Sequence, residues 1–320
     1  MIDAFVLRNE RIERLDHVEF AKSSEAGAFG KATVWVRCVS PDTDEIAALS
    51  EITKIPVEEF RESVEEDERS KVSVNRHLEI VFRAPTVEDG EIITLPIYIY
   101  AVGSTIVTIE RKKCKVLADL SAALLENKRR FLFKKQSGYF IFYVLDKIND
   151  EFLHFIDRIS VKLDFFKDRG AWTKENIESI YDSSVALSYF NQALIANIEV
   201  LNELRKSYYK LFGEDDRRHF TELYNDVLQI LDTEKVQREV MTNLFNMQSI
   251  ITANRLNQFM KAVAFFALII TIPTLITNIY GMNLAYLPLS GNRYAFFILL
   301  GFMAAISLIL YYFYRKTSTQ

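Results

Sequence analysis

The side chains near the C-terminus that have ion-binding chemistry are neutral oxygen donors. No Asp, Glu, His or Cys occurs between residues 262 and 320, whereas Asn278 and Asn283 offer carboxamide oxygens. Neutral oxygens can accept hydrogen bonds but carry no charge with which to hold a bare ion. These residue types therefore argue against a site that strips an ion of its water and holds it by charge.

Two long apolar runs must position these residues. No charged residue occurs from 262 to 280 or from 294 to 314. Each run has the ~20 residues that an α-helix needs to cross a bilayer core of ~30 Å. We therefore expect two membrane-spanning helices, at about 262–280 and 294–314, joined by a short loop, with both chain ends on one side.

One face of the first run is lined by small and polar residues at alternating steps of three and four. Polar groups within a span usually face water or the bundle interior, so this stripe is a candidate pore lining. The alternative is that small and hydroxyl residues merely let helices pack closely. Two spans cannot enclose water, so a pore requires several copies around an axis. The stripe comprises Asn257, Met260, Ala264, Ala267, Thr271, Thr274 and Asn278.

A long helix is predicted to lead into this span. Neither Pro nor Gly occurs between Asp215 and Pro273, and the acids at 215 and 216 suit a helix N-terminus. Two helices are expected before it, one ending at Gly170 and one from about Thr173 to Phe212. On the first of them, spacing places five acids on one stripe, which attracts cations or is simply exposed to solvent. These acids are Asp146, Asp150, Asp157, Asp164 and Asp168.

The first 115 or so residues alternate between strand-like and helix-like segments. Strands are expected at 32–40, 78–83, 92–100 and 105–109, because β-branched and aromatic residues dominate there. A helix is expected from Pro41 onward. An acidic cluster at 58–68 is either a divalent-ion site or a solvated helix face, and Arg61 and Arg69 favour the latter. Together these features predict a mixed α/β domain.

Composition excludes several classes of function. A net charge of −4 argues against general nucleic-acid binding, and the four His residues have no catalytic spacing. There is no phosphate-binding loop motif, so no energy source is encoded, and no enzyme is expected because catalysis has no candidate residues. Cys38 and Cys114 lack metal-ligand spacing and are expected to be reduced structural thiols.

Topology follows from the distribution of charge. The N-terminal segment lacks the apolar core of a signal peptide, so the body of the chain is expected in the cytoplasm. Both termini are expected there too. Arg255 and Lys261 precede the first span and Arg315 and Lys316 follow the second, against Arg293 alone in the loop.

The sequence Tyr280-Gly281-Met282-Asn283, at the end of the first of two C-terminal spans, resembles the CorA family of magnesium channels. The resemblance implies that Gly281, Met282 and Asn283 form the outer mouth of the pore, with Tyr280 beside them, as a selectivity filter. Alignment to the family also turns Val263 toward the axis. Intracellular Mg²⁺ is implied to close the pore. Glu222 stands where an acidic partner of that ion would fall, or is a solvated helix acid.

The sequence departs from the family in three places. The loop 284–290 has no acid to gather cations, and the basic tail is reduced to Arg315 and Lys316. Thr271 is polar at a level that is often apolar in relatives, which implies a leakier gate.

We therefore predict an α+β cytoplasmic domain (1–136), a helical stalk (137–260) and a two-span pore domain (261–320). The predicted assembly is a symmetric oligomer, a pentamer by the resemblance, in the cytoplasmic (inner) membrane. It passes Mg²⁺ down the membrane potential, binds Mg²⁺ also as a regulatory ion, and has no covalent cofactor. The alternatives are a Zn²⁺, Co²⁺ or Ni²⁺ transporter of the same family and a membrane-tethered scaffold or sensor.

Overall fold

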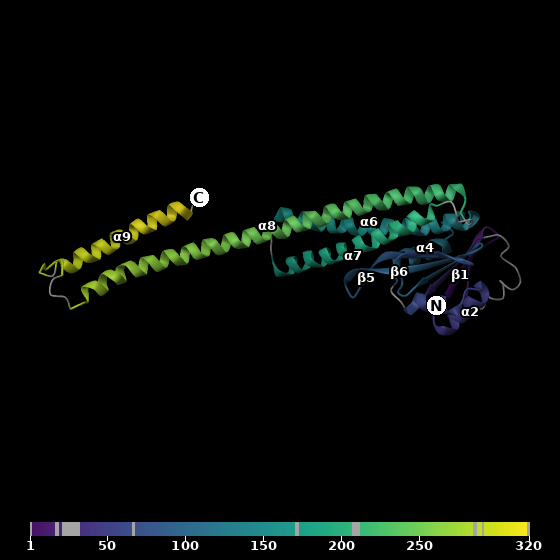
Figure 1. The fold of residues 1–320 in the computed structure, drawn as a ribbon, viewed down its shortest axis with the longest axis horizontal. Helices are drawn as coiled ribbons and strands as arrows, with labels where there is room; N and C mark the ends of the chain where they lie inside the picture. The colour runs from purple at the N-terminus through teal and green to yellow at the C-terminus, as the bar shows by residue number, and fades with distance from the viewer. Residues whose placement is uncertain are drawn as a thin grey trace. The chain divides into compact units, whose positions relative to one another are not determined.

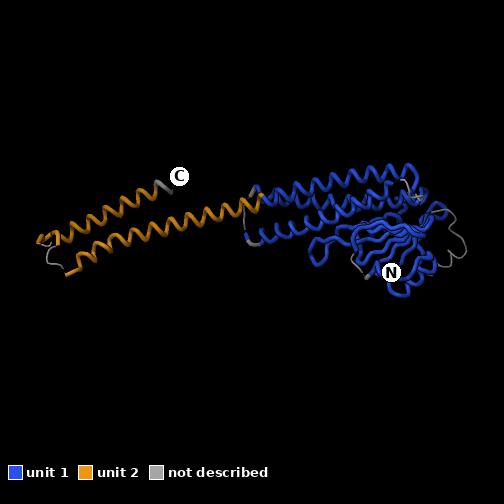
Figure 2. Tube along the Cα trace, in the orientation of Figure 1, with its two compact units in different colours: residues 1–242 blue, residues 243–320 orange. Residues whose placement is uncertain are grey.

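The computed structural model describes residues 2–16, 19–20, 33–65, 68–169, 173–206, 212–283, 287–289 and 291–318. The chain divides into two compact units, residues 1–242 and residues 243–320 (Figure 2). An α+β N-terminal region is followed by a long helix and a C-terminal apolar helix, which is the fold class that the sequence predicts.

The first unit is built on a mixed sheet, which has seven strands within the described residues, in the order β2-β1-β3-β7-β6-β5-β4. β3 and β7 pair in parallel, and all other neighbours are antiparallel. The four strands expected from sequence are present as β3, β5, β6 and β7, whereas β1, β2 and β4 were not anticipated. The strands are β1 (Ile2–Arg8), β2 (Arg11–Leu15), β3 (Val34–Val39), β4 (Lys71–Val74), β5 (Leu78–Glu88), β6 (Glu91–Val102) and β7 (Thr105–Glu110).

Successive side chains of each strand point to opposite faces of the sheet, and both faces are covered by helices. Val34 and Val36 of β3 join a core with Leu49 and Phe60, which come from α2 (Thr43–Thr53) and α3 (Val57–Glu65). On the opposite face, Trp35 lies 5.5 Å from the ring of Phe140 in α6. Figure 1 shows the sheet lying between α2 on one side and the helices that follow it on the other.

Helices dominate from residue 115 onward: α4 (Lys115–Leu125), α5 (Phe131–Lys134), α6 (Ser137–Arg169) and α7 (Lys174–Leu204). Apolar residues recur at steps of three and four along α6, and they form a seam that is buried at every position. α7 ends at Leu204 and not near Phe212 as expected. The buried seam consists of Leu145, Ile148, Phe152, Phe155, Ile159, Leu163 and Phe166.

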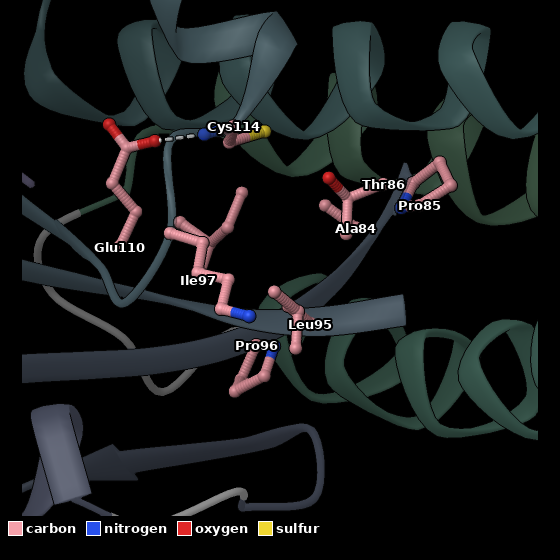
Figure 3. Close-up of a pocket in the computed structure, with 9 residues that line it drawn as sticks. Ala84, Pro85, Thr86, Leu95, Pro96, Ile97, Glu110 and Cys114 are labelled. Atoms are coloured by element: carbon pink, nitrogen blue, oxygen red, sulfur yellow. Dashed lines mark hydrogen bonds between the residues drawn. The ribbon is translucent and has the colours of Figure 1, made fainter. Parts of the chain in front are cut away.

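Two buried polar contacts fix the first unit. Arg37 of β3 and Glu110 of β7 form an ion pair at 2.5 Å (Nε to Oε1), and the backbone N–H of Cys114 donates to the same carboxylate (Figure 3). The side chain of Asn197 in α7 bonds both the N–H and the C=O of Arg83, at 2.9 Å each. β4 pairs with β5 only as far as Val81, so Asn197 satisfies backbone groups that β4 leaves unpaired.

The second unit contains the end of α8 (Glu214–Tyr280) and α9 (Ala295–Ser318). α8 is one helix of 67 residues, as the absence of Gly and Pro before position 273 predicts. Both helices are long and apolar enough to cross a membrane. α9 runs back beside the end of α8 (Figure 1), so the two apolar runs lie together, as two spans joined by a short loop should.

Candidate functional site

The end of α8 presents the Gly-Met-Asn segment to solvent. The N–H of Gly281 donates to the carbonyls of Thr277, at 2.8 Å, and of Asn278, at 3.2 Å, and Met282 donates to Ile279. Gly281 does not have a left-handed φ, and an added Cβ would meet only the Thr277 and Asn278 carbonyls, at 3.4 and 3.5 Å. Backbone conformation within one chain therefore does not require glycine here.

The stripe of small and polar residues lies on a free face of α8. α8 contacts α9 through another face, where Phe265, Ile269, Ile272 and Ile276 are half-buried. The stripe is exposed along its whole length, so it is available to water or to further copies of the chain. The exposed positions are Asn257, Met260, Val263, Ala264, Ala267, Thr271, Thr274 and Asn278.

Pro273 interrupts the hydrogen bonds of α8 within the stripe region. It has no N–H to donate to the carbonyl four residues before it. Nearby, the Thr274 hydroxyl donates to the Ile270 carbonyl, at 2.6 Å, and the Thr277 hydroxyl donates to the Thr274 carbonyl, at 2.9 Å. Hydroxyl groups thus add bonds to this part of the helix, as is common around a proline within a span.

The loop after α8 is tied back to the helix by a contact that sequence reasoning missed. The Tyr280 hydroxyl donates to the Pro288 carbonyl at 3.1 Å. The side chain of Asn292 then accepts from the N–H of Tyr294, just before α9 begins. Tyr280 therefore links the described ends of the loop on either side of residues 284–286. The motif in the sequence singled out Tyr280, but its hydrogen-bond partner, Pro288, could be identified only from the folded loop.

Glu222 lies among other carboxylates of the first unit. It is exposed, and its carboxylate lies 3.3 Å from Arg218 and 3.6 Å from His219. Burial raises the pKa of Asp226, one turn further along α8, and the charges of Asp146, Glu222 and Asp150 raise it further. The acidic positions of α6 and α8 therefore share one negative field, which the spacing of α6 alone did not reveal.

Lysine side chains partly neutralise the predicted acidic stripe of α6. Lys147 pairs with Asp146 and Asp150, and Lys167 pairs with Asp164. The side chain of Asp168 lies outside the described residues. Nowhere in the described ranges do three or more His, Cys, Asp or Glu side chains come close enough to hold a metal ion.

The acidic cluster at 58–68 and the two cysteines have contacts that suit a structural role. In the acidic cluster, Glu59 pairs with His77 at 2.7 Å, and residues 66–67 lie outside the described ranges. Cys38 and Cys114 are free and buried, and burial raises the pKa of the Cys114 thiol to about 11. A neutral, buried thiol is unreactive, in agreement with a structural role.

Comparison with known proteins supplies the family. The chain is 29% identical over 287 residues to the cobalt/magnesium transport protein CorA of Methanocaldococcus jannaschii, covering 89% of this chain and 90% of that protein. It is 24% identical over 302 residues to the magnesium transport protein CorA of Campylobacter jejuni, covering 87% and 88%. The complete structure of the M. jannaschii magnesium transporter superposes with a TM-score of 0.87 at 27% identity, over 98% of this chain and 97% of that one.

The family model of the CorA-like Mg²⁺ transporter protein matches residues 30–316, which include strands β3 to β7, α6, α7 and both apolar runs. Members of that family are membrane transporters or channels for ions, not enzymes, in line with the sequence prediction. The chain therefore belongs to the CorA-like Mg²⁺ transporter family.

Proposed function

We propose that this protein is a passive Mg²⁺ channel of the cytoplasmic membrane, in which the ion keeps most of its water and is selected at Gly281-Met282-Asn283. The observation that carries the proposal is the stripe of α8, exposed in the single chain and ending at that segment. Relatives with similar sequences are named as magnesium or cobalt/magnesium transport proteins.

The chemistry follows from the donors on this face. Several copies of α8 around one axis would turn the stripes inward and bring one Asn283 per chain into a ring. Carboxamide and backbone oxygens in that ring accept hydrogen bonds from the water of a hexahydrated ion. Because the ring is uncharged, the ion is held weakly and leaves again, which conduction requires.

The membrane potential supplies the driving force. A doubly charged ion that moves inward gains about 4.6 kcal/mol per 100 mV, twice the value for one charge. No nucleotide or second substrate is needed. Rings of Met260 and Val263, both apolar, would form the narrow inner part of the path and close it by dewetting.

Intracellular Mg²⁺ is proposed to favour the closed state through the acidic positions of α6 and α8, including Glu222. Lys147 and Arg218 offset part of this charge within one chain, and a divalent cation near Asp226 would relieve its remaining repulsion with Asp146, Asp150 and Glu222. The raised pKa of Asp226 supports this field.

The experiment is ion uptake into liposomes that contain the purified protein, under an inside-negative potential. Mg²⁺ uptake should follow the potential, and Zn²⁺ added outside at equal concentration should compete weakly. Uptake of Zn²⁺, Co²⁺ or Ni²⁺ in preference to Mg²⁺ supports the alternative transporter. No divalent uptake at any potential supports the scaffold or sensor and contradicts the channel.

A further inference from the structure

A groove between α8 and α9 borders the proposed pore-lining stripe at Asn257 and Ala264 and extends from there toward α9. It lies within the second unit and has a volume of about 710 Å³. Its lining changes character along α8, from polar residues before the apolar run to aromatic residues within it. The residues that matter are Asn254, Gln258, Lys261, Phe265, Phe313 and Tyr314.

The aromatic part of the groove is well packed. The rings of Phe265 and Tyr314 stack with their centroids 4.4 Å apart and their planes at 18°. Tyr314 lies near the end of the α9 apolar run, where aromatic rings with a polar edge usually meet the lipid head groups. This half of the groove offers an apolar wall to an acyl chain.

The polar half is positively charged and has no counter-ion in its own unit. Lys261 is the cation of the lining, and Glu239 is the last acidic residue of the chain, so no Asp or Glu side chain occurs in residues 243–320. Lys261 directly precedes the uncharged run 262–280, which puts its ammonium group at the edge of the hydrocarbon layer. The anions available at that depth are lipid phosphates.

We propose that this groove binds one anionic phospholipid of the phosphatidylglycerol type. Its phosphate pairs with Lys261 and accepts hydrogen bonds from the side-chain amides of Asn254 and Gln258, while one acyl chain lies against Phe265. The site depends on the membrane placement of α8 and α9 and not on which ion is transported, so its test does not use transport.

The test is lipid binding to the full-length protein in detergent, measured by native mass spectrometry with equal amounts of phosphatidylglycerol and phosphatidylcholine. The unaltered protein should prefer phosphatidylglycerol. Lys261→Gln should weaken phosphatidylglycerol binding about fivefold, the effect of one basic residue near a lipid surface. Lys261→Arg should keep the preference. Arg293→Gln, which removes a charge from the other loop, should leave binding unchanged.

Several outcomes would overturn the proposal. One is equal binding of the two lipids. Another is unchanged phosphatidylglycerol binding in folded Lys261→Gln. If inorganic phosphate displaces the lipid at equal concentration, the groove is a phosphate site. If Lys261→Gln dissociates the oligomer equally in both lipids, the groove is a contact between copies of the chain.

Discussion

Side chains at the proposed filter are neutral, which affects both how an ion reaches the filter and how it is recognised there. Asn283 and Met282 are exposed at the end of α8, and the sequence from there to Asn292 has no acid. Without a negative field at the mouth, divalent ions are not concentrated there before entry. Recognition then depends on the geometry of hydrogen bonds to the water shell of the ion, which is the property that distinguishes Mg²⁺ from larger cations.

The buried pair Arg37–Glu110 gives a prediction that can be checked by pH. Burial raises the pKa of Glu110, while its bonds to Arg37 and Cys114 oppose the rise. Arg37→Ala leaves the carboxylate buried without its cation, which should cost about 3–5 kcal/mol of stability at neutral pH. The carboxyl pKa then rises further, so the folded variant takes up a proton that the unfolded chain does not hold.

The stability deficit of Arg37→Ala should therefore shrink as the pH falls from 8 to 5, measured as the difference in melting temperature from the unaltered protein. The matched control is Arg37→Ala with Glu110→Gln, whose deficit should not vary with pH in this range. A deficit of the single variant that grows on acidification contradicts this account of the pair.

At the scale of elements, Asn197 adds a polar contact to the packing of α7 against β4, β5 and β6. Asn197 is fully buried, and its side chain also accepts a hydrogen bond from the Ser70 hydroxyl at 2.8 Å. Asn197→Ala should destabilise the first unit by about 2 kcal/mol, because the N–H and C=O of Arg83 lose their partner. Thermal unfolding followed by near-ultraviolet circular dichroism measures the loss. Asn225→Ala, at an exposed position of α8, should have no effect, and equal melting of the two variants would contradict the role of Asn197.

The elements differ in how far the sequence could predict them. α8 was predictable because a long run without Gly or Pro and an apolar segment are local features of the chain. β1 and β2 were not, because β1 joins the sheet by pairing with β3, which is far from it in the sequence. Likewise, the hydrogen bond between Asn197 and Arg83 joins residues 114 positions apart, and no local sequence pattern predicts it.

The candidate site shows the same division. The motif at 280–283 and the stripe were readable from residue type and spacing, and the structure leaves that stripe exposed. The proximity of Asp226 to Asp146 and Asp150 depends on the packing of α8 against α6, so it could be identified only from the structure. The hydrogen bond from Tyr280 to Pro288 likewise could be identified only once the loop was seen in its folded form.

For the whole molecule, regulation by internal Mg²⁺ is testable through the shared acidic field. Glu222→Gln with Asp226→Asn removes an i,i+4 pair of like charges, which contributes on the order of 0.5 kcal/mol to cation attraction. The internal Mg²⁺ concentration that halves uptake should therefore rise about two- to threefold. Asp164→Asn, whose carboxylate pairs with Lys167, is the control and should not change it. Unchanged inhibition in the double variant would exclude Glu222 and Asp226 as sensors.

An assembly is required by the proposed path, because one copy of α8 and α9 leaves the stripe open to its surroundings. In an assembly, the Asn283 side chains of all copies act on the same ion. One substitution in the sequence therefore alters the whole ring, and its effect on ion passage should be large.

Potential-driven Mg²⁺ uptake into liposomes containing Asn283→Ala, compared with the unaltered protein at equal incorporation and equal oligomeric state, tests this account most directly. Loss of the amide oxygens should reduce uptake by about a hundredfold, as expected when two or more hydrogen bonds of ~1.5 kcal/mol to the hydrated ion are lost. Asn225→Ala should conduct normally. Uptake by Asn283→Ala at the rate of the unaltered protein would contradict selection by an amide ring at the end of α8.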